Sequence, residues 1–445
     1  MQTALRPRTF ILFAGDLFFF IFALWLSLYL RAFEAPSREL FLQHLAPFSL
    51  LFVVWVAVFF IAGLYESRSI ILERRALSAT LLITQVVNVA IASLFFFYVP
   101  IFGIAPKTVL LIYLAVSFLL VLCWRAVLFP TFLQHTEPAI VVGEGNEIGE
   151  LVEALSRARR APARIVSVIS PGPALAREIA DTIRAQHIRI VIADWSDPRV
   201  AGIFPGLYNY LSAGVRFFDA IALYEDVFGR IALSRIDDRW IARNVSRYAH
   251  TLYDSFKRMM DIIIAGLAGV VSLVLYPFLA LAIVIESGFP VFIAQERVGE
   301  DNRPMKIYKF RSMTRNEVDL SVGMQDNRVT AVGKFLRATR LDELPQLWSI
   351  VRGNLSLIGP RPELPSGVAL YEKEIPYYDV RHLIKPGLSG WAQLYQDNHP
   401  HHGEAVEATR EKLSYDLYYV KHRSLVLDLV IAMKTIKKLL TRSGA

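Results

Sequence analysis

Asp342 and Glu343 are adjacent carboxylates among clusters of mainly basic residues, and together they could carry out group transfer. Pro345 is tolerated only in the first turn of a helix, so we expect a helix to begin near Asp342 or Glu343. Its free N–H groups and its dipole would form an anion site beside the carboxylates. The cations expected to balance the carboxylates and a bound phosphate are Lys309, Arg311, Arg337, Arg340 and Arg361. The pattern therefore indicates chemistry on a phosphate group.

The two carboxylates can have separate roles, because neighbouring residues on a helix point about 100° apart. Asp342, kept ionised by the arginines, could attack a phosphorus atom and form an acyl phosphate. Glu343 could then act as a general base. Mg²⁺ typically binds one or two carboxylates together with substrate phosphates, and Asp342 is its candidate ligand. The alternative is that the Asp-Glu pair only caps the helix and interacts with its dipole.

The amino-acid composition indicates a protein associated with a membrane. At about 150 residues per domain, the 445 residues should form about three domains. Hydrophobic residues make up 54% and charged residues 20%, which excludes a disordered chain and a coiled coil. The net charge of +8 favours an anionic membrane surface or phosphorylated substrates over nucleic acid. The single cysteine, Cys123, excludes a disulfide within one chain.

The N-terminal part, residues 1–130, is predicted to cross the membrane four times. Each of four apolar runs is long enough, or nearly so, to span a hydrocarbon layer of about 30 Å, at 9–30, 47–65, 79–100 and 108–124. Lys and Arg are more frequent at the N-terminus and in the second loop than in the first and third loops. Because such residues are retained on the cytoplasmic side, the N-terminus and everything after Arg125 are predicted to be cytoplasmic. Asp16, inside the first run, could mark an ion pathway, but a hydrogen bond at a helix end or between helices is favoured.

Residues 137–228 are predicted to form a Rossmann-like α/β domain. Short β-rich runs alternate with helical ones, which indicates a parallel sheet, with strands at 139–142, 164–169, 189–193 and 215–218. The turn after the first strand contains Gly143, Gly145 and Gly149, which resembles a dinucleotide-binding fingerprint with its third glycine one residue late. A nucleotide or phosphate at this turn is one interpretation; a scaffold without that ligand is favoured.

Two later segments are predicted to lie at the membrane surface. Residues 229–256 are a basic amphipathic linker, expected on the anionic leaflet unless it packs on the neighbouring domain. Residues 262–285 carry no charge, but Pro277 interrupts them, so we expect a re-entrant helix that bends there. The carbonyl freed by the proline needs a buried partner such as Ser272.

The entrance of this re-entrant helix is expected to hold Lys257 and Arg258 at headgroup level, with Asp261 in its first turn. Residues 425–440 mix lysines with apolar positions and are interpreted as an interfacial helix. The alternative for this helix is packing against the catalytic domain.

The order of motifs over residues 257–445 resembles the bacterial sugar transferase family, the monotopic phosphoglycosyl transferases that act on polyprenyl phosphate. The resemblance rests on Lys257-Arg258 with Asp261, the apolar hairpin with Pro277, Gln295 to Gly299, Lys309 to Met313, Asp342 to Leu347, Gly359 to Pro362, and Pro386 to Trp391. The four spans and the α/β domain resemble the N-terminal half of the family's large members. The resemblance implies a mixed α/β monotopic catalytic domain with a re-entrant membrane helix, at the cytoplasmic face of the bacterial inner membrane.

The same resemblance implies a ping-pong reaction. Asp342 would attack the β-phosphorus of a UDP-sugar, UMP would leave, and polyprenyl phosphate, assisted by Glu343, would then accept the sugar phosphate. It further implies Mg²⁺, a possible homodimer, and phosphate contacts from Lys309, Arg311, Arg337 and Arg361. Three other active-site positions are expected at Arg297, Arg340 and Asp416. The alternatives are a membrane-bound nucleotide-sugar dehydratase and a non-catalytic regulator of polysaccharide assembly.

Overall fold

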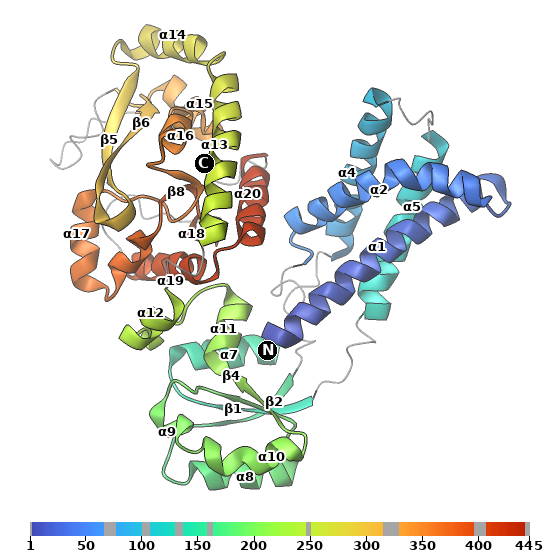
Figure 1. Cartoon of the computed structure of the whole chain (residues 1–445), viewed down its shortest axis with the longest axis vertical. Coiled ribbons are helices and arrows are strands. Elements are labelled where there is room, and N and C mark those ends of the chain that lie inside the picture. The colour runs from blue at the N-terminus through green and yellow to red at the C-terminus, as the bar shows by residue number, and fades with distance from the viewer. Residues whose placement is uncertain are drawn as a thin grey trace. The chain divides into compact units, whose positions relative to one another are not determined.

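The computed structural model describes residues 2–65, 77–99, 107–129, 137–157, 163–245, 251–314, 329–395 and 406–440. The chain forms two compact units, Met1–Gly229 and Arg230–Ala445 (Figure 1). The first unit contains the N-terminal helices and the α/β domain. The second contains Asp342, Glu343 and the basic motifs predicted to surround them.

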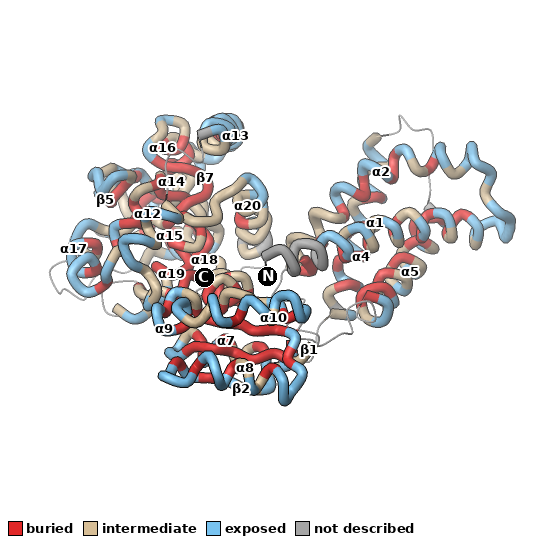
Figure 2. Tube along the Cα trace, turned by 60° about the horizontal axis from the view of Figure 1, so that its bottom comes forward, coloured by how far each residue is buried: buried red, intermediate tan, exposed pale blue. Residues whose placement is uncertain are grey.

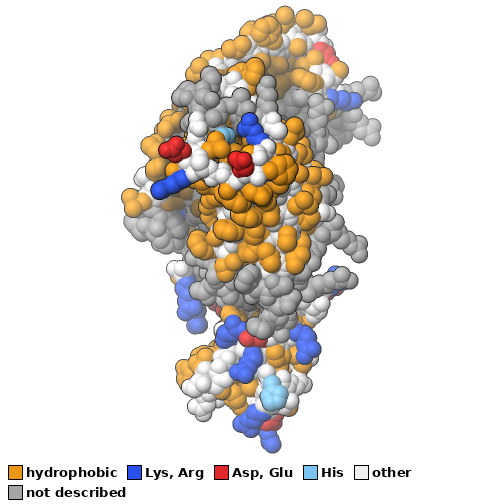
Figure 3. Space-filling view, turned by 90° about the vertical axis from the view of Figure 1, so that its right-hand side faces the viewer, with side chains coloured by type: hydrophobic (Ala, Val, Ile, Leu, Met, Phe, Trp, Pro, Cys, Tyr) orange, Lys and Arg blue, Asp and Glu red, His pale blue; other side chains and the backbone are white. Residues whose placement is uncertain are grey.

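Four helices of the first unit are long and apolar enough to cross a membrane, as predicted. They are α1 (Gln2–Ala32), α2 (Arg38–Ile61), α4 (Leu77–Tyr98) and α5 (Lys107–Cys123), the last continuing as a π-helical turn, Trp124–Leu128. Hydrophobic side chains dominate the face of these helices in Figure 3. α2 begins nine residues before the apolar run, because Ser37 caps it by accepting from the Leu40 N–H at 3.2 Å. The loop arginines that set the predicted orientation, in 66–76, lie outside the described residues.

Asp16 of α1 is fully buried and forms an ion pair with Arg125, whose Nε donates to Asp16 Oδ1 at 3.0 Å. The Tyr65 hydroxyl also donates to this carboxylate, at 2.7 Å. Arg125 Nη1 donates to the Leu64 carbonyl at 2.9 Å. The interhelix interpretation of Asp16 is therefore confirmed. Its main partner lay one residue beyond the predicted fourth run.

The α/β domain has the predicted parallel sheet, in the order β2-β1-β3-β4. Its strands are β1 (Glu137–Val142), β2 (Ala163–Ile169), β3 (Ile190–Ala193) and β4 (Arg216–Asp219). Its main helices are α7 (Asn146–Arg157), α8 (Leu175–Gln186) and α11 (Ala220–Phe228). The central strands β1 and β3 are the most buried, as their apolar runs require. Figure 2 shows the buried residues at β1.

The carboxyl edge of this sheet carries acidic groups. Glu144, between Gly143 and Gly145, is ion-paired with Arg199, and Asp219 caps α11 by accepting from the Ile221 N–H at 2.8 Å. Asp194 directly follows β3 and is buried. Carboxylates at this edge would repel a phosphate, which supports the scaffold interpretation.

The second unit is built around two consecutive helices, α13 (Thr251–Ser272) and α14 (Tyr276–Ser287), bent by 58° where they meet. An antiparallel hairpin follows, β5 (Phe292–Val298) and β6 (Pro304–Phe310). Next come α15 (Ala331–Thr339), α16 (Gln346–Arg352) and the parallel pair β7 (Ser356–Ile358) and β8 (Gly387–Ser389). The remaining helices are α12 (Asp238–Asn244), α17 (Pro365–Glu374), α18 (Trp391–Tyr395), α19 (Val406–His422) and α20 (Leu425–Leu440).

The bend between α13 and α14 differs in detail from the prediction. α13 ends at Ser272, and Pro277 lies in the first turn of α14, where its missing N–H is harmless. The Leu273 carbonyl accepts from the Tyr276 N–H at 3.3 Å, whereas the Ser272 hydroxyl donates to the Gly269 carbonyl at 2.7 Å. Ser272 is therefore not the partner of the freed carbonyl. Such a bent pair suits a re-entrant loop or a broken span, so re-entry stays a prediction.

The linker expectation is wrong for residues 231–245. Its apolar side chains, including Ile231 and Trp240, pack with Tyr371 of α17 and Leu417 of α19 in one hydrophobic core. The alternative, packing on the neighbouring domain, is the one observed. α20 combines both interpretations, because Ile431 is fully buried while Val426 and Leu429 are exposed.

Candidate active site

Asp342 lies in a 3-10 turn, Leu341–Glu343, between α15 and α16. Arg340 ends α15 in the left-handed conformation, with φ 58°, and this reverses the chain into the turn. Pro345 precedes α16, which begins at Gln346. The α-helix therefore starts three residues or more after the predicted position, and the carboxylates belong to the turn before it.

Asp342 is buried, with 8% of its surface exposed. Its Oδ1 accepts no hydrogen bond from any residue that the structure describes. Burial, followed by the charge of Glu343, raises its pKa to about 6, against the lowering effect of Lys309, Arg337 and Arg340. The cations therefore oppose the upward shift but do not cancel it. Its pKa still leaves it mostly ionised at neutral pH.

Glu343 has the opposite surroundings. Arg361 Nη2 donates to Glu343 Oε1 at 3.0 Å, and Arg340 Nη1 lies 3.7 Å from the same oxygen. Burial acts to raise the pKa of Glu343, but Arg361 and Arg340 outweigh it, so the pKa is lowered. A carboxylate held in this way is a weaker base than an ordinary glutamate, which argues against the expected general-base role.

Arg361 is positioned by the turn that follows β7. Gly359 is required in this turn because a Cβ there would lie 2.5 Å from the Lys385 carbonyl oxygen. The carbonyl of Arg361 accepts from Arg381 Nη2 at 2.9 Å. The guanidinium thus projects to Glu343 from a fixed backbone.

Asp416 contacts Arg381 in this structure. It forms an ion pair with Arg381 at 2.7 Å, and both side chains are buried. Glu363 adds to this cluster, with ion pairs to Lys412 and to Arg381. Although burial acts to raise it, the pKa of Glu363 is lowered to about 2 by Lys412 and Arg381. Asp416 therefore acts on the site indirectly, through the arginine that holds the Arg361 backbone.

The other predicted cations divide into two groups. Lys309 and Arg337 lie near enough to lower the pKa of Asp342, and Arg337 Nε also donates to the Ser312 hydroxyl at 2.9 Å. Arg311 is different, because its guanidinium donates to the carbonyls of Ser287, Gly288 and Phe289, at the end of α14. Its guanidinium therefore holds the end of α14, and its phosphate contact stays a prediction.

Arg297 lies beside the turn that carries Arg361. Its Nη2 donates to Gln295 Oε1 at 2.6 Å, and its Nη1 donates to the Pro362 carbonyl at 3.4 Å. It supports the active-site turn in this structure.

The charged residues of α13 contact protein groups, and their position at headgroup level stays a prediction. Arg258 donates to the carbonyls of Ile350 and Val351 at 2.6 and 2.7 Å, at the end of α16. Asp261 Oδ1 accepts from the Leu357 N–H of β7 at 3.1 Å. Lys257 Nζ lies 2.8 Å from Oδ2 of Asp428, a residue of α20. α13 begins six residues before Lys257, so these residues are not at its entrance.

Sequence reasoning missed the buried cluster of Arg381, Glu363 and Lys412. A signal was present, because Arg381 stands in the partly apolar run 378–384 and a buried charge needs a partner. The partners lie 18 residues before it and 31 residues after it, so the sequence alone could not identify them.

The residues present suit a metal that relies on substrate for most of its ligands. No cluster of three or more candidate metal ligands occurs among the described residues. Asp342 offers a buried oxygen without a hydrogen-bond partner in the same part of the chain. One carboxylate combined with phosphate oxygens is a typical Mg²⁺ environment.

The C-terminal unit matches the sequence model described as bacterial sugar transferase over residues 252–442. The chain is also 39% identical over 265 residues to the UDP-N-acetylgalactosamine-undecaprenyl-phosphate N-acetylgalactosaminephosphotransferase of Aeromonas hydrophila. This match covers 57% of this chain and 60% of that protein. It is 39% identical over 186 residues to a UDP-glucose:undecaprenyl-phosphate glucose-1-phosphate transferase of Klebsiella pneumoniae, covering 41% of this chain and 40% of that protein.

The UDP-glucose:undecaprenyl-phosphate glucose-1-phosphate transferase of Caulobacter vibrioides is 38% identical over 195 residues, and the match covers 43% of this chain and 72% of that relative. The matched region contains every residue of the candidate site. The chain therefore belongs to the bacterial sugar transferase family.

Proposed function

We propose that the protein transfers a sugar 1-phosphate from a UDP-sugar to polyprenyl phosphate, the first membrane step of glycan assembly. The observation that carries this proposal is the buried Oδ1 of Asp342, which has no hydrogen-bond partner among the described residues and lies near Lys309 and Arg337. The substrates named for the Aeromonas and Klebsiella relatives support the substrate class.

The reaction proceeds in two displacements at one phosphorus atom. A carboxylate oxygen of Asp342 attacks the β-phosphorus of the UDP-sugar, the bond from that phosphorus to the bridging oxygen breaks, and UMP leaves with the oxygen. The sugar phosphate then remains on Asp342 as an acyl phosphate. A phosphate oxygen of polyprenyl phosphate attacks the same phosphorus and releases the carboxylate. The products are UMP and polyprenyl diphosphate sugar.

The neighbouring side chains bind and orient the phosphates. Lys309, Arg337 and Arg340 stabilise the charge that develops on the transferring phosphoryl group. Glu343 holds Arg361 at 3.0 Å and so fixes the direction of its guanidinium. Bound Mg²⁺, held by Asp342 and by substrate phosphate oxygens, would neutralise phosphate charge.

The proposed setting is the cytoplasmic face of the bacterial inner membrane, with the α13–α14 pair re-entrant and the protein a homodimer. The four apolar helices support a membrane location. Exposed apolar side chains continue along α13 and α14, including Leu267, Val271 and Phe278. A dehydratase or a non-catalytic regulator is less favoured, because neither explains the buried Asp342 oxygen among cations.

The test supplies the purified protein with Mg²⁺, polyprenyl phosphate and a panel of UDP-sugars, and measures UMP release. One UDP-sugar should give release, and Asp342→Asn should abolish it, while the exposed control Glu372→Gln should retain it. Without the acceptor, mass spectrometry should find a phosphosugar on the peptide containing Asp342. Full turnover by Asp342→Asn would contradict the covalent mechanism.

A further inference from the structure

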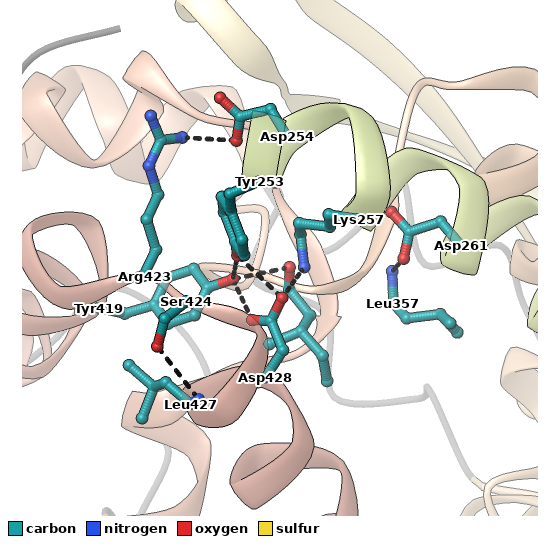
Figure 4. Close-up of polar contacts among 11 residues, drawn as sticks. Tyr253, Asp254, Lys257, Asp261, Leu357, Tyr419, Arg423, Ser424, Leu427 and Asp428 are labelled. Carbon is teal, nitrogen blue, oxygen red and sulfur yellow. Dashed lines mark hydrogen bonds and ion pairs between the residues drawn. The ribbon is translucent and has the colours of Figure 1, made fainter. Parts of the chain in front are cut away.

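A cavity of about 390 Å³ lies in the second unit, between the first turns of α13, the β5–β6 turn, β7 and the end of α19. Neither Asp342 nor Glu343 lines it. Figure 4 shows one side of it, where Tyr253, Lys257 and Tyr419 converge on the Asp428 carboxylate. Beside them, Arg423 pairs with Asp254 at 3.3 Å. The cavity therefore has a wall of hydrogen-bonded polar side chains and is separate from the reacting carboxylate.

Two groups in the cavity wall have capacity to bind a ligand. Ser356 is 1% exposed, and its hydroxyl has no hydrogen-bond partner in the part of the chain that the structure describes. Asp261 is 5% exposed and accepts one bond, from the Leu357 N–H, among the described residues. A buried hydroxyl and a buried carboxylate with a spare oxygen are suited to a hydrogen-bond donor that carries positive charge, such as a primary ammonium.

The charges of the cavity wall select against a purely anionic ligand. Four Lys or Arg side chains and four Asp or Glu side chains line it, so their formal charges cancel. A diphosphate would meet Asp254, Asp261 and Glu300 as well as the cations. A zwitterion can instead place its ammonium at Asp261 and its phosphate at basic groups such as Lys385 and Arg423.

The position of the cavity indicates a membrane source for this zwitterion. Ile262, Ile263 and Ile264 directly follow Asp261 on α13 and are 42%, 48% and 44% exposed. Leu425 and Val426 begin α20 directly after the Arg423 region and are also exposed. Apolar surface thus starts beside the polar cavity on two helices, as at the boundary between headgroups and acyl chains.

We infer that this cavity binds the headgroup of a phosphoethanolamine lipid, with the ammonium on Asp261 and Ser356 and the phosphate on the basic side chains. The lipid would be a bound structural ligand beside the active site, separate from the polyprenyl acceptor. This inference rests on the membrane placement of α13 and not on the transfer reaction.

The test uses the full chain in detergent and native mass spectrometry, with phosphatidylethanolamine, phosphatidylcholine and phosphatidylglycerol of identical acyl chains. Phosphatidylethanolamine should be retained about tenfold better than the other two, since loss of one charged hydrogen bond costs roughly that factor. Asp261→Asn and Ser356→Ala should each remove the preference. The matched controls on α17, Glu372→Gln and Ser366→Ala, should keep it.

Three results would overturn the inference. Equal retention of phosphatidylcholine, whose ammonium has no N–H, would exclude ammonium recognition. Preference for phosphatidylglycerol would show an anion site. Competition by soluble glycerophosphoethanolamine at the same concentration would exclude a membrane source. None of these readouts uses activity, so they are independent of the proposed transfer reaction, and Ser356→Ala covers the case in which Asp261→Asn fails to fold.

Discussion

Arg361 donates a hydrogen bond to Glu343 at 3.0 Å, whereas the adjacent Asp342 has a buried Oδ1 that no described residue bonds. The two neighbouring carboxyls consequently have pKa values shifted in opposite directions, upward for Asp342 and downward for Glu343. Groups whose surroundings separate their pKa values in this way commonly have different roles. Here the unpaired carboxylate is the candidate nucleophile, and the paired one holds an arginine.

Transfer activity should fall at acidic pH because the nucleophile must be ionised. Burial and then Glu343 raise the pKa of Asp342 to about 6. We expect kcat/KM for UMP release to decline below about pH 6, approaching tenfold per pH unit. A pH–rate profile with the cognate UDP-sugar checks this. A rate that stays constant down to pH 4.5 would contradict the assignment.

Asp342→Asn should make the folded protein more stable at neutral pH. A carboxyl whose pKa is raised in the folded state is destabilising when ionised, and this cost appears as the pH rises from the unfolded value, 3.8, to about 6. A shift of about two units corresponds to roughly 3 kcal/mol. The variant should melt at higher temperature than the wild type at pH 7.5, with the difference shrinking toward pH 4. A lower melting temperature at pH 7.5 would show that the ionised carboxylate stabilises the site.

Arg361→Ala should reduce the rate by about 100-fold or more, as for other preorganised groups that bind developing phosphoryl charge. Arg361 also interacts electrostatically with Asp342, so its loss should raise the pKa of Asp342 and move the acidic limb of the pH–rate profile to higher pH. Arg361→Lys keeps a charge without the planar fork and should give an intermediate rate. The exposed Arg352→Ala is the matched control, and an equal loss there would assign the effect to general charge.

Arg258→Ala should lower both the melting temperature and kcat, because it leaves two carbonyls at the end of α16 without their donor. We expect a loss of about 1–3 kcal/mol in stability. Thermal melts and UMP release, with the exposed Arg243→Ala as control, check this. Normal kcat with a lowered melting temperature would limit Arg258 to a stabilising role.

Asp16→Ala should destabilise the membrane helices, because it leaves the Arg125 guanidinium buried without its ion-pair partner. Loss of one partner of a buried pair typically costs about 3–5 kcal/mol. Asp16→Leu combined with Arg125→Met should cost less than either single change. Melting temperatures of Asp16→Leu, Arg125→Met and the double variant, measured in one detergent, test this. A double variant whose loss of stability equals the sum of the two single losses would contradict the coupling.

The sequence was most informative where periodicity and length decide the structure. The four long apolar helices and the four parallel strands follow from apolar runs bounded by polar turns, and the structure confirms both sets of elements. The start of α16 was misplaced because the sequence does not distinguish a 3-10 turn from the first turn of an α-helix. The linker was misplaced because an amphipathic face can bury itself against lipid or protein, and only the partner surface, here Tyr371 and Leu417, decides.

The sequence allowed most residues of the candidate site to be predicted. It was less informative about which partners these residues contact. Lys309 and Arg337 do lie near Asp342, whereas Arg311 binds carbonyls at the end of α14. A guanidinium can donate to phosphate and to carbonyl oxygens alike, so residue type could not separate these roles. The Arg381 cluster depends on contacts across tens of residues, which no local pattern reveals.

The three hydrogen bonds that α13 makes through Arg258 and Asp261 reach α16, which follows the carboxylate pair, and β7, which precedes Arg361. If α13 lies in the bilayer as proposed, both segments would move together with this helix. Thermal undulation of the membrane would therefore displace the reaction centre as a whole while leaving the spacing of its reacting groups unchanged.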